Sequence, residues 1–151
     1  MKVTDLSELE QRLVQLARQT RLNAQAPYSN FLVGAAVIAE GLYSGVGCNV
    51  ERANYASGSH AEQVAVDSLI AKYGPTRLVA IAIAGAMRGK EPSAPIWPCG
   101  HCRQIIWENC AGDVNVRVIT CRGDDEVEIA TIGELFAKPF GPLDLGVNLF
   151  K

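Results

Sequence analysis

Residues 31–39 read Phe-Leu-Val-Gly-Ala-Ala-Val-Ile-Ala, an apolar run that is too short for a good helix and is followed by Glu40-Gly41. Such a run, bounded by a turn, predicts a buried strand, and residues 42–48 predict its partner in a hairpin. Residues 78–86 form a second apolar run of strand length. The centre of this protein is therefore predicted to be a β-sheet.

Helical patterns surround these strands. Apolar residues recur at helical spacing near the N-terminus, and Ser7 with Glu10 has the form of a capping box, which predicts an amphipathic helix over residues 5–23. Further helices are predicted over 59–73 and 99–109, and a further strand over 114–120. This alternation, in a chain of 151 residues with 48% hydrophobic content, predicts one α/β domain (residues 1–151) with a mixed sheet.

Charge and composition exclude several classes of function. The formal net charge is -2, and the charges are interspersed without a basic run that could follow a phosphate backbone, so no nucleic-acid partner is predicted. No apolar stretch approaches the roughly 20 residues of a membrane span, and no membrane partner is predicted. Residues 1–10 mix acids with leucines, unlike a secretory signal, and the five cysteines are an odd number; both observations predict a cytoplasmic protein with free thiols.

Two short clusters, each at a predicted helix start, carry the chemistry: Ser-His-Ala-Glu-Gln at 59–63 and Trp-Pro-Cys-Gly-His-Cys-Arg-Gln at 97–104. Cys99 and Cys102 are one helical turn apart, so both sulfurs can face one point, and the positive end of a helix dipole lowers thiol pKa. His60 would bring the protein ligands to three, which with an open fourth position is the pattern of catalytic zinc. One zinc ion per chain is predicted.

Glu62 lies two residues after a ligand, where it can take a proton from water beside the metal without binding the metal itself. His-x-Glu together with Pro-Cys-x-x-Cys is the signature of zinc nucleobase deaminases. Each part has a simpler alternative: Ser59-x-x-Glu62 is also a capping box, Cys-x-x-Cys is also a redox pair, and His101 is a possible fourth ligand that would close a structural site. We predict instead that His101 lies outside the ligand set, because adjacent helical residues point about 100° apart.

The chain resembles the cytidine deaminase family. Besides the two clusters, the resemblance is carried by residues 26–31 (Ala-Pro-Tyr-Ser-Asn-Phe), 33–36 (Val-Gly-Ala-Ala), 47–51 (Gly-Cys-Asn-Val-Glu) and 141–145 (Gly-Pro-Leu-Asp-Leu). It implies a three-layer α/β/α sandwich with a mixed sheet of about five strands. It also implies zinc-dependent hydrolytic deamination of cytidine and deoxycytidine in pyrimidine salvage, with free pyrimidine nucleosides as substrates.

The resemblance also implies roles for individual residues. Asn49 and Glu51 would hold the ribose 3′-hydroxyl, Phe31 would line the base pocket, and the Ala61 backbone N–H with Glu62 would read the pyrimidine edge. Phe140 is the candidate for an aromatic side chain that reaches into a neighbouring subunit and stacks on the base. A pocket completed in this way requires an oligomer, for which a homotetramer is predicted and a homodimer is the alternative.

His60 and Gln63 depart from the commonest single-domain pattern, which has a third cysteine and often an arginine at these positions, and they look more like the larger, two-domain branch. Arg52 and the irregular residues 88–97 leave modified cytosine nucleosides open as substrates. Rival functions are a deaminase of a free base, a nucleotide or a nucleoside antibiotic, a tRNA adenosine deaminase, and a non-catalytic zinc-stabilised module. Asn49 and Glu51 argue against the first two substrates, the lack of a basic footprint against tRNA, and Glu62 against the module.

Overall fold

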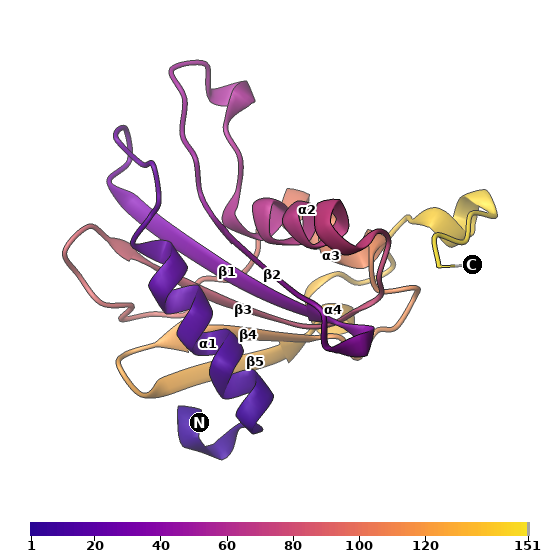
Figure 1. Cartoon of the computed structure of the whole chain (residues 1–151), viewed down its shortest axis with the longest axis horizontal. Coiled ribbons are helices and arrows are strands. Elements are labelled where there is room, and N and C mark those ends of the chain that lie inside the picture. The colour runs from indigo at the N-terminus through magenta and orange to yellow at the C-terminus, as the bar shows by residue number, and fades with distance from the viewer. Residues whose placement is uncertain (151) are drawn as a thin grey trace.

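The computed structural model describes residues 1–150, which fold around a five-stranded sheet in the order β2-β1-β3-β4-β5 (Figure 1). The strands are β1 (Phe31–Ala39), β2 (Ser44–Cys48), β3 (Leu78–Met87), β4 (Arg117–Arg122) and β5 (Glu126–Thr131). The α-helices are α1 (Glu8–Arg21), α2 (Ala61–Tyr73), α3 (Gly100–Glu108) and α4 (Ile132–Leu135), and short 3-10 turns lie at Val3–Asp5, Glu40–Leu42, Tyr55–Ser57 and Pro142–Leu145.

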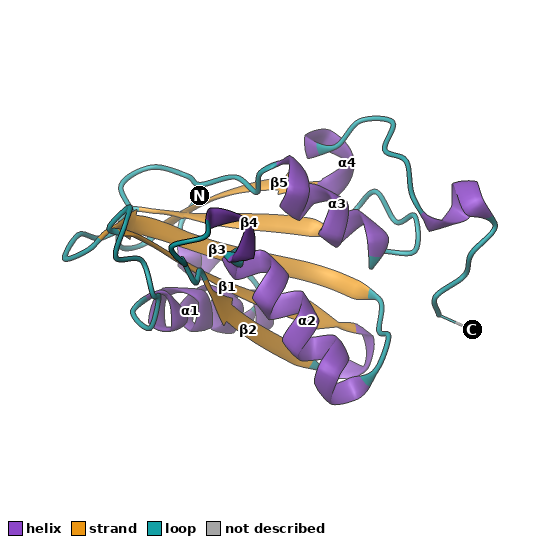
Figure 2. Cartoon of the chain, turned by 90° about the horizontal axis from the view of Figure 1, so that it is seen from above, coloured by secondary structure: helices purple, strands orange, loops and turns teal. Residues whose placement is uncertain are grey.

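The sheet is mixed, as the sequence predicted. β1 pairs antiparallel with both β2 and β3, β3 pairs parallel with β4 through the crossover that contains α3, and β4 pairs antiparallel with β5. The predicted hairpin is therefore formed by β1 and β2. β2 and β3 lie on either side of β1 and both run antiparallel to it, so they point in the same direction. The starts of α2 and α3, which follow these two strands, therefore lie at the same end of the sheet (Figure 2).

Helices cover both faces of the sheet, which gives three layers (Figure 2). Ala36 and Ile38 of β1 belong to the core shared with α1, whereas Ala35 and Val37 belong to the core shared with α2 and α3. Alternate residues of β1 are thus buried on opposite faces, which is why the strand reads as a continuous apolar run. The predicted three-layer sandwich is confirmed.

The bounds of several elements differ from the predictions; β4, for example, lies at Arg117–Arg122 and not at the predicted 114–120. Ser7 caps α1 by accepting from the amide of Glu10, so the helix begins at Glu8 and ends at Arg21, inside the predicted range. A sheet of about five strands was predicted but β5 was not located, although Glu126-Val-Glu-Ile alternates polar and apolar residues as a half-buried edge strand does. It closes the far edge of the sheet as a hairpin with β4.

Close packing of α2 on β2 sets the position of the α2 start. A Cβ added at Gly47 would lie 2.4 Å from both the carbonyl oxygen of Ala61 and the amide nitrogen of Ala65, so only glycine allows this approach. The first turn of α2 consequently rests directly on the sheet, beside the segment that leaves β2. This contact fixes the residues that flank Ala61.

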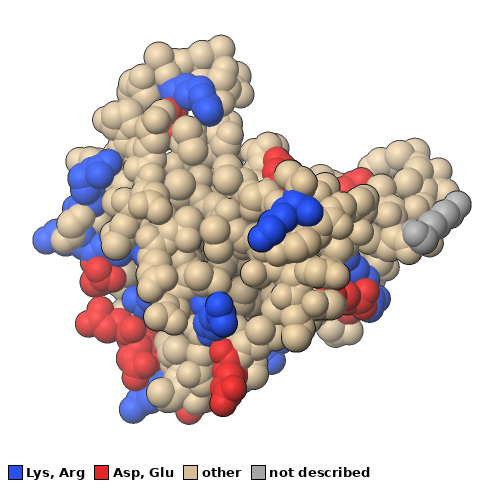
Figure 3. Space-filling model, in the orientation of Figure 1, with Lys and Arg blue, Asp and Glu red and all other residues tan. Residues whose placement is uncertain are grey.

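Two surface properties bear on possible partners. Within the described residues, none of the helices is both long enough and apolar enough to cross a bilayer. On the face drawn in Figure 3, Lys and Arg side chains are scattered and interleaved with Asp and Glu, and much of the central surface is uncharged. This face has no extended basic track of the kind that follows a polyphosphate backbone.

Candidate metal centre and its cavity

His60, Cys99 and Cys102 come together at the starts of two helices. His60 is the residue that precedes α2, Cys99 precedes α3, and Cys102 lies in the first turn of α3. His60 Nδ1 lies 3.4 Å from Cys99 Sγ and 3.3 Å from Cys102 Sγ, and the three ligand atoms lie within 4.8 Å of one another. The predicted ligand set is therefore assembled in space.

The spacing of these atoms fits zinc. Tetrahedral Zn–N and Zn–S bonds place nitrogen and sulfur ligands about 3.5 Å apart, close to the two distances from His60 Nδ1. Burial raises the pKa of the Cys102 thiol, and the nearby Glu62 and Cys99 raise it further, so a thiolate at this position needs a cation beside it. His60 and Cys99 are exposed and face a cavity, which leaves room for a further ligand that is not protein.

Glu62 is buried, with 6% of its surface exposed, and lines the same cavity. The alternative interpretation of Glu62 as half of a capping box is wrong, because His60 and not Ser59 is the N-cap of α2, and it makes no side-chain cap. The Ser59 amide instead donates to the Val50 carbonyl at 2.9 Å. A buried carboxylate beside the metal ligands, with no part in helix capping, is suited to moving protons.

The cavity has a volume of about 550 Å³. The residues around the metal site that line it are His60, Ala61, Glu62 and Cys99, and it is also lined by Tyr28, Ser29, Val33, Asn49, Val50, Glu51, Arg52, Tyr55, Gly58, Ser59, Ile96 and Trp97. The loop that carries Tyr55 projects from the body between β2 and α2 (Figure 1). The structure thus brings the predicted metal, acid and sugar residues to one cavity of ligand size.

Asn49 completes the hydrogen bonding of β1 with its side chain. Its Oδ1 accepts from the Val33 amide at 2.8 Å, and its Nδ2 donates to the Phe31 carbonyl at 2.9 Å. An amide group can make four hydrogen bonds, so one donor hydrogen and one acceptor lone pair remain. Asn49 is therefore held rigidly while keeping capacity for a ligand.

Glu51 has a similar double arrangement. Its carboxylate accepts from the amides of Tyr28 (2.8 Å) and Ser29 (3.1 Å), and from the Ser29 hydroxyl. The Ser29 hydroxyl is the largest cause that lowers the pKa of Glu51; burial opposes it, and the two amides add to the lowering. The carboxylate is consequently ionised at neutral pH and is fixed in place against residues 28–29.

The three remaining predicted residues lie in different surroundings. Ala61 lines the cavity, and its amide is in the first turn of α2, where amides lack partners within the helix. Phe31 is not among the lining residues; its ring edge and Ile96 both cover Gly85 of β3, next to the cavity. Phe140 is 63% exposed, is outside the lining of this cavity, and belongs to the C-terminal segment that projects from the body (Figure 1).

The sequence did not assign individual roles to several residues of the cavity wall. Trp97 immediately precedes Pro98-Cys99, so its proximity to a ligand was a usable signal. Tyr28 and Tyr55 pack edge to face, with ring centroids 5.9 Å apart, but they are far apart in the sequence. His101 is exposed and lies 3.2 Å from the Gln63 side chain, outside the ligand set as predicted, and this contact ties the two ligand-bearing helices together.

Comparison with known protein families identifies the same region. Residues 7–118 match the family model described as the cytidine and deoxycytidylate deaminase zinc-binding region. This match extends over more than half of the chain and includes His60, Glu62, Cys99 and Cys102.

Individual relatives and solved structures agree. A cytidine deaminase of Sporosarcina psychrophila is 33% identical over 135 residues, which cover 89% of this chain and 93% of that protein. A longer cytidine deaminase, from Proteus mirabilis, is 33% identical over 127 residues, which cover 83% of this chain but 37% of that protein. The crystal structure of cytidine deaminase from Burkholderia pseudomallei superposes with a TM-score of 0.75 at 35% identity, covering 89% of this chain and all of that chain.

Proposed function

This chain belongs to the cytidine deaminase family, and from that premise we propose that it converts cytidine and deoxycytidine to uridine and deoxyuridine by zinc-dependent hydrolysis, with release of ammonia. The observation that carries the proposal is the convergence of His60, Cys99 and Cys102 beside a cavity that His60, Cys99 and the buried carboxylate of Glu62 line. A zinc-stabilised module without catalytic activity would have no use for that carboxylate.

His60, Cys99 and Cys102 would hold a zinc ion, which would supply Lewis acidity and make water a better nucleophile near neutral pH. Glu62 accepts a proton from the attacking water while the oxygen of that water bonds to C4 of the pyrimidine. Glu62 then delivers this proton to ring N3. A second proton, from the new C4 hydroxyl, passes through Glu62 to the exocyclic amine. The C4–N bond then breaks, ammonia leaves, and C4 keeps a carbonyl oxygen.

Orientation of the nucleoside would come from the two ends of the cavity. At the base end, the Ala61 amide and Glu62 would read the pyrimidine edge. At the sugar end, the free donor and acceptor of Asn49 and the remaining lone pairs of Glu51 suit a 3′-hydroxyl, which is both donor and acceptor. A fixed carboxylate here also repels phosphate, which favours nucleosides over nucleotides.

The wider setting is proposed on the same basis. We propose one catalytic domain over residues 1–151 and a cytoplasmic location, which suits five cysteines that form no disulfide. We also propose a homotetramer, with a dimer as the alternative, in which the exposed Phe140 of one subunit stacks on the base bound by its neighbour.

The proposed reaction is tested by the loss of pyrimidine absorbance when the purified protein is mixed with cytidine. Cytidine and deoxycytidine should be converted, whereas cytosine, cytidine monophosphate and adenosine should react far more slowly; N4-acetylcytidine would reveal tolerance of modified amines. Conversion of cytosine or the monophosphate with a specificity constant equal to that for cytidine would contradict the proposal.

A further inference from the structure

Residues 88–99 connect β3 to the helix that carries two zinc ligands, and their last part forms a wall of the cavity through Ile96, Trp97 and Cys99. Within residues 1–150, no hydrogen bond is formed by residues 93–97. Their path is therefore set by side-chain packing, of Ile96 over Gly85 and of Trp97 against the core, and by hydrogen bonds at the two ends of the connection. At the far end, Arg103 Nε donates to the Pro98 carbonyl at 2.8 Å.

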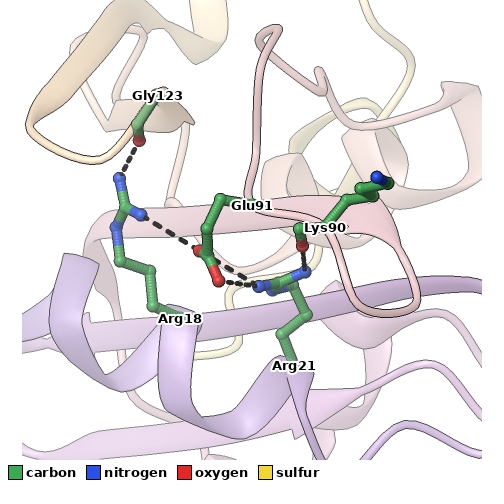
Figure 4. Close-up of polar contacts among 5 residues, drawn as sticks. All are labelled: Arg18, Arg21, Lys90, Glu91 and Gly123. Carbon is green, nitrogen blue, oxygen red and sulfur yellow. Dashed lines mark hydrogen bonds and ion pairs between the residues drawn. The ribbon is translucent and has the colours of Figure 1, made fainter.

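The near end is held by Arg21, the last residue of α1 (Figure 4). Only 2% of Arg21 is exposed. Its Nη1 donates to the Lys90 carbonyl at 2.9 Å, and its Nη2 lies 3.3 Å from both carboxylate oxygens of Glu91. One guanidinium thus binds the backbone and the side chain of two successive residues in the connection.

Arg18 and Gly123 extend this anchor to the sheet (Figure 4). Arg18 Nη1 lies 3.8 Å from the Glu91 carboxylate, and its Nη2 donates to the Gly123 carbonyl at 2.5 Å. The Gly123 amide in turn donates to the Pro92 carbonyl at 2.5 Å. The connection is therefore fastened between α1 and the β4–β5 turn, and it is unsupported by hydrogen bonds beyond Pro92 until Pro98.

Burying an arginine at this position is costly, because the guanidinium loses hydration and Arg21 Nε has no hydrogen-bond partner. Favourable interaction with the helix dipole explains a cation in the last turn of α1, but an exposed side chain would provide that without burial. The end of α1 is also pressed onto β1: a Cβ at Gly34 would lie 2.4 Å from the Arg21 amide nitrogen. This close packing of α1 on β1 places Arg21 beside the connection.

From these contacts we infer that Arg21, through Glu91 and the Lys90 carbonyl, is a positioning residue that holds the Ile96–Trp97 wall in place for the substrate. The inference rests on the proposed function, since it assigns a role in that same cavity. Arg21 does not line the cavity; it acts on binding through the five residues between Glu91 and Trp97. Its loss should therefore weaken substrate binding more than the chemical step.

The test combines Arg21→Met, Glu91→Ala and the double variant in the full-length protein. Glu91 has a side chain that is 62% exposed, so Glu91→Ala should fold even if Arg21→Met does not. We expect each single variant to raise KM for cytidine roughly tenfold with kcat nearly unchanged and zinc retained. The double variant should raise KM no more than the single variant with the larger effect, because both substitutions remove the same contact. Arg21→Lys keeps the charge, so its KM should lie between those of the wild type and Arg21→Met.

A second measurement does not depend on activity. Trypsin cleaves after Lys90, whose carbonyl is held by Arg21, and Arg21→Met leaves the sequence at that bond unchanged; cleavage there should become several-fold faster. The matched control is Glu40→Ala, which removes another arginine–carboxylate pair, with Arg77, far from this connection. It should change neither KM nor the cleavage rate.

The outcomes separate this inference from the proposed function. Unchanged KM in Glu91→Ala, or an equal rise in Glu40→Ala, would overturn the positioning role even if the wild type deaminates cytidine. A wild type inactive on cytidine would overturn the proposed function, whereas faster cleavage after Lys90 in Arg21→Met would still support the anchor.

Discussion

The metal end and the sugar end of the cavity are built in different ways. At the metal end, His60, Cys99 and Cys102 gather at two helix starts, and neither helix uses these side chains as caps. At the sugar end, Asn49 and Glu51 are bonded to the backbone of residues 28–33. A mutation at the metal end should therefore abolish activity with little loss of folding stability, whereas a mutation at the sugar end alters structure and substrate binding together.

The strongest test of this separation removes the metal. Cys99→Ala with Cys102→Ala leaves one protein ligand, so zinc should fall from about one per chain to near zero and activity should be lost. Cys99 is exposed and caps nothing, and replacing the buried Cys102 by alanine removes only its sulfur atom, so the far-UV circular dichroism should stay close to that of the wild type. Elemental analysis measures the zinc, and Cys48→Ala is the matched control. Undiminished zinc in the double variant would refute the ligand assignment.

Replacing the acid should give the next largest effect. Glu62→Gln keeps the shape of the side chain but cannot accept and return protons, so kcat should fall by about 10²- to 10⁴-fold. Zinc content and the melting temperature should change little, because Glu62 does not cap α2. Steady-state kinetics and elemental analysis of the same sample measure kcat and zinc content. A kcat near that of the wild type would show that Glu62 has a structural role only.

The contrast between the two ends also explains what the sequence could predict. His60 and Glu62, and Cys99 and Cys102, are close in sequence, so helical geometry alone places each pair. Glu51 and its turn at residues 28–29 are more than 20 residues apart, and only the folded sheet brings them together. Arg21 and Glu91 meet in the same way: the helical stripe predicted α1, but nothing in it indicated that its last arginine is buried against a distant loop.

At the sugar end, a change in the substrate is sharper than a mutation. 3′-Deoxycytidine lacks the hydroxyl that Asn49 and Glu51 would bind and leaves the protein untouched, so its kcat/KM should be roughly 10- to 100-fold below that of cytidine. Deoxycytidine, which keeps the 3′-hydroxyl, is the control and should react well. Ser29→Ala removes one hydrogen bond to Glu51 without removing the carboxylate, so it should preserve most of this discrimination. Equal specificity constants for cytidine and 3′-deoxycytidine would contradict the sugar-binding role.

The smallest expected effect lies outside both ends of the cavity, at Phe140. This residue is 63% exposed in a segment whose backbone is tied to α3 by a hydrogen bond of 3.0 Å from Gln104 Nε2 to the Phe140 carbonyl. An exposed aromatic ring on an anchored, non-helical segment is well placed to enter a neighbouring subunit and stack on a flat base. Phe140→Ala should therefore raise KM several-fold and leave zinc and the fold intact, whereas Leu143→Ala, also exposed in this segment, is the matched control and should have a smaller effect.

Mixing subunits decides whether Phe140 acts in its own chain or in its neighbour. Glu62→Gln subunits carry an intact Phe140 but no acid, and Phe140→Ala subunits carry the acid but no ring. After dissociation and reassembly of the two variants, a site that combines Glu62 of one subunit with Phe140 of the next would regain the wild-type KM. Recovery requires both an oligomer and a ring that acts across the interface, because neither variant alone contains such a site. A KM that remains that of Phe140→Ala in oligomers shown to be mixed would mean that Phe140 acts within its own chain or not at all.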